Sequence, residues 1–227
     1  MTRTVPTALW SAVVIAAMAG FGVAPHADAA SACSDLGGTV GPEQTCHVQG
    51  TGPGYTLDFS FPVDYPDQQA ITDFLTDQRD QMADYATKFP PNTRPAPYEL
   101  DITGTAYQRG TPQPATQSVV FEIQNDTGAA NQGRPTISYK ALNYDLGRGA
   151  PITFATLFKP GTTPLDVYRA ASSGTALPPP DAFGAHDYQN FAIDDDAVIF
   201  FFDHDFLNEE GPDQVSVPRA DLAELLA

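Results

Sequence analysis

The sequence predicts an α+β domain with a mixed or antiparallel sheet, and three observations support this prediction. From Pro66 to Lys88 apolar residues recur at helical spacing, with no glycine and no further proline. Runs of alternating or β-rich residues, bounded by Gly, Pro and Asn, occur before and after this stretch. The run Val198–Phe202 is entirely large and apolar, which is typical of a strand buried on both faces. Strands interleaved with one long helix are characteristic of the α+β class.

The first residues have the pattern of a secretory signal peptide. Arg3 precedes a run without acid or base from Ala8 to Ala24, and Ala27-Asp28-Ala29 then supplies an A-x-A cleavage site. An uncleaved membrane anchor is the alternative, but a run of about 17 residues is at the short limit for crossing a bilayer. We therefore expect residues 1–29 to be removed and residues 30–227 to form a single secreted domain without a membrane span.

The cysteines indicate one disulfide bond. The chain has two, Cys33 and Cys46, and in an exported protein the expected state is a bridge between them. It would close a loop of about 14 residues, worth about 3 kcal/mol in the chain-entropy description. A metal site would need His47 and further ligands at closer spacing, so we expect no metal and no cofactor.

The remaining elements follow from the alternation of apolar residues and from the turn residues that bound each run. A flexible break at Gly50–Gly54 precedes an alternating strand, and three later strands begin an antiparallel meander. Residues 151–158 mix strand and helix signals, and residues 172–187 form a loop rich in Ser, Gly and Pro. The apolar run Val198–Phe202 is expected to be the central strand, and Leu222, Leu225 and Leu226 to lie on a C-terminal helix. The other expected elements are strands at 55–61, 98–109, 117–125, 135–144, 188–193 and 214–217, and two turns of helix at 164–171.

The net charge of −17 limits the class of partner. A field of this sign repels nucleic acid and anionic membrane surfaces, which argues against either as a partner. An acidic surface would attract cationic partners instead. Solubility of a secreted protein is the simpler explanation of the same charge.

No motif in the chain establishes catalysis. The G-x-S-x-G motif of many secreted hydrolases does not occur. A triad of Ser173 with His186 and either Asp187 or Asp203 can be drawn, but triads are defined by geometry and not by composition. The candidate catalytic residues are therefore Ser173, His186 and Asp187.

Two further groups are candidates for binding. The acids at 194–196 and the sequence Asp203-His204-Asp205 could ligate a hard cation, although three acids in a row are more typical of a solvated turn. His204 between two aspartates would have its protonated form favoured, which makes it a candidate pH-responsive contact. Among the tyrosines, Tyr65 and Tyr188 are the best candidates for an exposed ligand groove, with core packing as the simpler alternative.

Several of these segments resemble one known family. They run in order over the whole expected mature chain: Cys33 and Cys46, Tyr65–Gln68, Ala96–Thr103, Tyr139–Ala141, Pro151–Thr153, Tyr188–Ala192, Val198–Phe202 and Val217–Arg219. Together they resemble the secreted immunogenic protein family of mycobacteria. Residues from about 150 to 227 also resemble a domain found in the extracytoplasmic part of lysozyme-sensing anti-sigma factors.

The resemblance implies a β-grasp-like α+β domain with its sheet packed on one long helix, secretion or cell-wall association, and recognition by the host immune system. It supplies no agreed catalytic residue, although esterase activity has been proposed for close mycobacterial relatives. We therefore expect a non-enzymatic binding module whose partner is a protein, in particular a basic one, or a cell-wall component. The alternative is a short-chain ester hydrolase.

Overall fold

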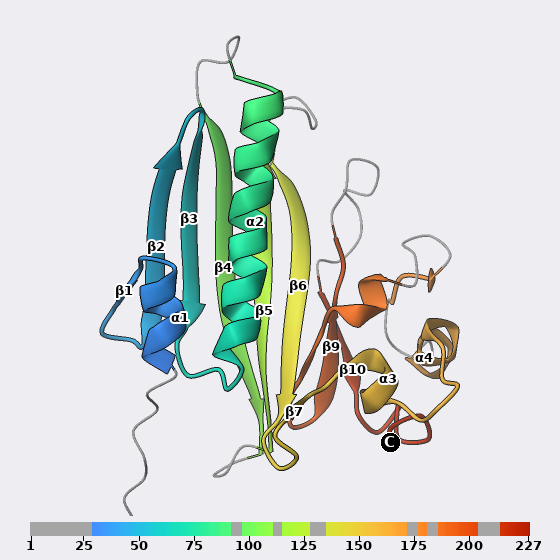
Figure 1. Ribbon diagram of the computed structural model, residues 1–227. Helices are drawn as coiled ribbons and strands as arrows, with labels where there is room; N and C mark the ends of the chain where they lie inside the picture. The colour runs from blue at the N-terminus through green and yellow to red at the C-terminus, as the bar shows by residue number, and fades with distance from the viewer. Residues whose placement is uncertain are drawn as a thin grey trace, which may run out of the picture.

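The computed structural model describes residues 29–91, 97–110, 115–127, 135–171, 177–180, 186–203 and 214–227 (Figure 1). The helices are α1 (Ala29–Asp35), α2 (Gln68–Lys88), α3 (Phe154–Leu157), α4 (Pro164–Ala171) and the 3-10 helix η2 (Asp187–Gln189). The strands are β1 (Thr39–Val40), β2 (Thr45–Gly52), β3 (Tyr55–Pro62), β4 (Tyr98–Arg109), β5 (Thr116–Asp126), β6 (Thr136–Asp145), β7 (Ala150–Pro151), β8 (Phe191–Ile193), β9 (Ala197–Phe201) and β10 (Gln214–Pro218). Residues 1–28 of the predicted signal peptide and most of the predicted 172–187 loop lie outside the described residues. No helix in the described ranges is long and apolar enough to span a bilayer.

A seven-stranded sheet in the order β1-β2-β3-β4-β5-β6-β7 forms most of the molecule. Neighbouring strands are antiparallel except β3 and β4, which are parallel. A parallel pair requires a long crossover connection, and α2 lies within the connection between β3 and β4. The predicted α+β class with a mixed sheet is therefore confirmed.

Helix α2 begins at Gln68, two residues after the predicted start at Pro66. The Asp67 carboxylate accepts a hydrogen bond from the Ala70 N–H at 3.1 Å, so Asp67 is the N-cap and Pro66 lies outside the helix. At the other end Lys88 pairs with Asp84 at 2.6 Å, one turn earlier. The bounds otherwise agree with the prediction.

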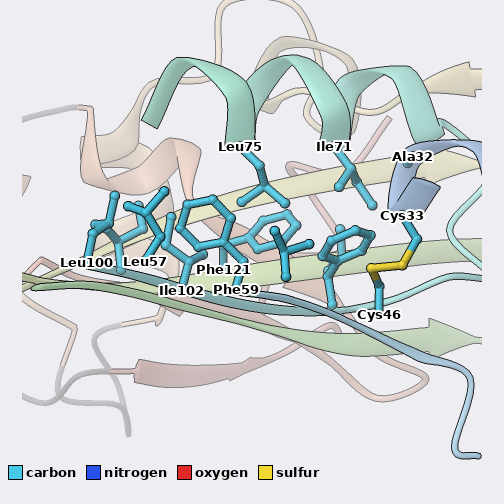
Figure 2. Close-up of a cluster of buried hydrophobic side chains, with 14 of the residues drawn as sticks. Ala32, Cys33, Cys46, Leu57, Phe59, Ile71, Leu75, Leu100, Ile102 and Phe121 are labelled. Carbon is cyan, nitrogen blue, oxygen red and sulfur yellow. A yellow bond between two sulfur atoms is a disulfide. The ribbon is translucent and has the colours of Figure 1, made fainter. Parts of the chain in front are cut away.

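The first hydrophobic core lies between α2 and one face of the large sheet (Figure 2). Ile71 and Leu75 are fully buried and point from the helix toward Phe59, Ile102 and their neighbours on the strands. The disulfide between Cys33 and Cys46 joins α1 to β2 at the edge of this core, as predicted. Helix α1 and strands β1 and β2 were not predicted; the Gly50–Gly54 segment continues β2 to Gly52, and only the two following residues form the hairpin turn.

A second sheet, β10-β9-β8, packs on the opposite face of the large sheet beside β5 and β6. The apolar run at 198–202 supplies the central strand of this small sheet and not of the large one. Phe200 faces a second core that includes Val167 of α4, whereas Phe201 packs with Val120 and Ala141 of the large sheet. This explains why the run is apolar on both faces.

The expected C-terminal helix does not form. Residues 219–225 make turns in which Leu222 is buried in the second core. The backbone pairs with the segment after α3 instead, since Lys159 N–H donates to Leu225 O at 2.8 Å and Ala227 N–H donates to Leu157 O at 3.0 Å. These bonds to a distant segment replace those that a helix would make within itself.

Candidate functional site

The two tyrosines that were the best candidates for exposure are buried. Tyr188 is fully buried in the second core, and its hydroxyl donates to the Pro178 carbonyl at 2.5 Å. Tyr65 is only 3% exposed and packs edge-on against Tyr144. Burial, and then the charge of Asp67, raise the pKa of the Tyr65 hydroxyl. Both rings therefore pack in hydrophobic cores, which is the simpler alternative that the sequence offered, and neither lies in an exposed groove.

The residues of the drawn triad are described only in part. His186 is exposed just before η2, whereas Ser173 and the Asp187 side chain lie outside the described residues, as does His204. The alternative acid, Asp203, accepts a hydrogen bond from the Tyr139 N–H at 2.8 Å and so ties β9 to β6. The catalytic geometry therefore stays a prediction.

The acids at 194–196 form the exposed turn between β8 and β9 that the sequence predicts. The Asp195 carboxylate accepts from the Gly110 N–H at 2.6 Å, which fastens this turn to the end of β4. Among the described residues, no three His, Cys, Asp or Glu side chains gather in a way that could hold a metal ion.

The candidate site is the part of the large sheet opposite α2 that the second sheet leaves open. We call it the acidic face, and its carboxylates come from β3, β4 and β5: Asp58, Glu99, Asp101, Glu122 and Asp126. Residues on β4 alternate strictly, with Leu100 and Ile102 buried under the helix and Glu99, Asp101 and Thr103 exposed. The pleat therefore turns every second side chain of this strand away from the core.

Strand register places the acids side by side. Asp58 on β3 is directly opposite Asp101 on β4, and these are flanked by Gln49 on β2 and Gln124 on β5. One row further along, Glu99 is opposite Asp126. Cross-strand neighbours of like charge are destabilising. The aligned carboxylates therefore repel one another and disfavour the fold locally.

The electrostatics of the acidic face support this interpretation. Partial burial, and then the charges of Asp58 and Glu99, raise the pKa of the Asp101 carboxyl. Gln49 donates to Asp58 at 3.0 Å and Gln124 donates to Glu122 at 2.7 Å, but these amides carry no charge. Strands β2, β3 and β5 contain no Lys or Arg, and β4 has only Arg109 at its far end.

The acidic face is slightly hollowed. Gln49, Thr51, Thr56, Asp58 and Asp101 line an open depression of about 400 Å³. Sequence reasoning missed this site because its residues come from three strands whose parallel and antiparallel pairings bring them together. The alternation of Glu99, Asp101 and Thr103 with apolar residues was the only local signal.

Comparison with known proteins shows that the chain is similar to several proteins of mycobacteria. No protein-family model matches it. It is 42% identical to Esterase Rv3036c of Mycobacterium tuberculosis, over 99% of each chain. It is 36% identical to immunogenic protein MPT64 of Mycobacterium tuberculosis and to immunogenic protein MPB64 of Mycobacterium bovis, over 86% of this chain and 88% of each relative.

Among solved structures, the chain is similar to a DUF3298 family protein from Pseudomonas aeruginosa, with a TM-score of 0.52 over 83% of this chain and 96% of that one. The 11% identity limits this likeness to the fold. The resemblance of the C-terminal part to anti-sigma factor ectodomains stays a prediction. On the strength of the 36% identity across most of its length, the chain belongs to the mycobacterial family of the immunogenic proteins MPT64 and MPB64.

Proposed function

We propose that the protein is a secreted or cell-wall-associated binding module that docks a basic protein on its acidic face. The observation that carries the proposal is the row of Asp58, Asp101 and their acidic neighbours on an open sheet surface. The described strands β2 to β5 hold no Lys or Arg there except Arg109 at the far end of β4. The net charge of −17 extends the attraction beyond contact distance. The relatives named immunogenic proteins support the coarser statement that the chain is antigen-like.

The test uses lysozyme as a basic probe protein at about 20 mM salt. The variant Asp58→Asn, Glu99→Gln, Asp101→Asn should weaken binding at least about tenfold, because each lost charge removes attraction at the interface. A rise to about 0.3 M salt should also weaken binding by the wild type, since the attraction between the charges then reaches less than about 8 Å. Isothermal titration calorimetry measures both effects.

The matched control carries the same change in net charge on the other side of the sheet. Asp73→Asn, Asp77→Asn, Asp80→Asn removes three exposed acids of α2 and should change the affinity less than about threefold. Equal loss in both triple variants would show that only net charge matters. Undetectable binding of the wild type at low salt would reject the proposed partner class.

A short-chain ester hydrolase is the second candidate, and the relative named an esterase at 42% identity favours it. An assay of the purified protein on p-nitrophenyl butyrate should then show turnover that Ser173→Ala and His186→Ala abolish. Ser172→Ala is tested beside them because Ser172 is the neighbouring serine. Turnover that survives all three replacements would reject the triad, and a wild type without turnover would reject the class.

A further inference from the structure

A pocket of about 300 Å³ lies where the lower end of the large sheet in Figure 1 meets the second sheet. One wall is a single row across three strands, since Arg109 on β4 is opposite Thr116 on β5 and Thr116 is opposite Asp145 on β6. The facing wall comes from the second sheet, with Ile193 at the end of β8 and Arg219 directly after β10. The pocket is thus built by both sheets, well away from the acidic face.

The pocket gathers positive charge in a strongly acidic protein. Arg109, Arg148 and Arg219 all line it, out of a total of 11 Lys and Arg residues in the chain. Burial, and then the charge of Arg109, lower the pKa of the Arg219 guanidinium. Two guanidinium groups therefore repel each other across a space that is partly shielded from water.

The carboxylates at the pocket do not neutralise these two arginines. Asp145 accepts from the backbone N–H groups of Gly147 and Arg148, both at 2.9 Å, and its other oxygen lies 3.7 Å from Arg148 Nε. Ala227 also lines the pocket. Within the described part of the chain, neither Arg109 nor Arg219 has a carboxylate at ion-pair distance.

Two buried polar atoms of the pocket-lining residues have no hydrogen-bond partner among the residues that the structure describes. They are Arg109 Nε and Thr116 Oγ1, and Thr116 as a whole is only 7% exposed. A buried donor without an acceptor costs about 1–3 kcal/mol, so most such groups in folded proteins are paired. Both atoms belong to pocket-lining residues that are opposite each other in one strand pair, and both groups can donate to an oxygen acceptor.

Most of the remaining lining is aliphatic. Ala150, Pro151, Ile152, Leu157, Leu226 and Ala227 join Ile193, and Thr156 is the polar exception. Inorganic phosphate or sulfate would leave these side chains without a partner, whereas a short hydrocarbon chain would cover them. The pocket therefore combines an anion-binding end with an apolar end, as small-molecule sites commonly do.

We propose that this pocket binds a small organic carboxylate with a short aliphatic tail. The carboxylate oxygens accept from Arg109 Nε–H, from the Thr116 hydroxyl and from the Arg219 guanidinium, in the charge-assisted geometry that arginine provides. The tail packs on Ile152 and Leu157. The anion also relieves the repulsion between the two arginines.

The test is a titration of the ¹⁵N-labelled full chain with sodium butyrate, followed by amide chemical shifts at constant ionic strength. We expect saturable shifts near Arg109, Thr116 and Arg219, with a dissociation constant in the range of about 0.1–10 mM for so small a ligand. Arg109→Gln and Arg219→Gln should each weaken binding about tenfold or more, whereas Arg79→Gln, an exposed arginine on α2, should leave it unchanged. The neutral 1-butanol should not bind.

Two further measurements separate a binding role from a folding role. Without ligand, Arg219→Gln should keep or raise the midpoint of thermal unfolding, because it removes the repulsion with Arg109. A folded Arg219→Gln protein that binds butyrate as the wild type does would overturn the proposal. Saturation by inorganic phosphate but not by butyrate would overturn the choice of a carboxylate, and no saturation by either anion up to about 50 mM would overturn the site.

Discussion

The disulfide gives the most direct test of how the N-terminal segment is held. Cys33 on α1 and Cys46 on β2 are 13 residues apart and both fully buried. A closed loop of about 14 residues restricts the unfolded chain by about 10 cal/mol/K, or about 3 kcal/mol at 25 °C. Replacing both residues by Ala should therefore lower the free energy of unfolding by about 3 kcal/mol. For a chain of this size the expected fall in the unfolding midpoint is about 6–12 °C.

The assay is urea unfolding of the wild type and of the Cys33→Ala, Cys46→Ala variant, with the reduced wild type as a second reference. Reduction opens the loop without removing buried atoms, so the difference between reduced wild type and variant isolates the packing of the two sulfur atoms. A loss below about 1 kcal/mol with an unchanged denaturant slope would refute the reasoning. It would mean that the bridge does not restrict the unfolded chain as the loop length requires.

Three further predictions concern stability. Gly38→Ala should destabilise the fold by about 1–3 kcal/mol in urea unfolding, because an added Cβ would lie 2.6 Å from the Cys46 sulfur in a packed region. Asp101→Asn should raise stability at pH 7 by about half a kcal/mol, allowing for solvent screening. Since the folded-state pKa of Asp101 is raised, its ionised form is the destabilising one, and the gain should vanish as the pH falls below that pKa. Leu75→Ala should cost about 2–5 kcal/mol, against less than about 0.5 for the exposed Leu165→Ala.

Local patterns predicted the long elements well. Strand β4 and helix α2 were placed within two residues of their ends, because strict alternation and helical spacing each persist over many residues. Strands β5 and β6 were also placed within one residue of their ends, for the same reason. The disulfide was predictable because the chain offers only one possible pairing.

What failed depends on contacts between distant segments. Tyr188, at the start of a predicted strand, was a candidate for exposure, but it packs in the second core against Phe200 and Phe202. The sequence predicted that the run at 198–202 is the central strand of one sheet. No sequence pattern indicated that a second sheet exists. Both errors arise because sequence pattern reports which face of an element is apolar and not which surface will cover it.

The acidic face and the pocket lined by Arg109 and Arg219 each bring together charges of one sign. The charges are negative on the acidic face and positive in the pocket. A chain selected only for stability would distribute its few bases among its many acids, as Arg79 with Asp80 and Lys88 with Asp84 do. It would neither align Asp58 beside Asp101 nor bring Arg109 toward Arg219. Natural proteins depart from local consistency mainly at functional sites. Because the two departures lie at separate places on the large sheet, each can be neutralised without the other, and loss of basic-protein binding need not accompany loss of carboxylate binding.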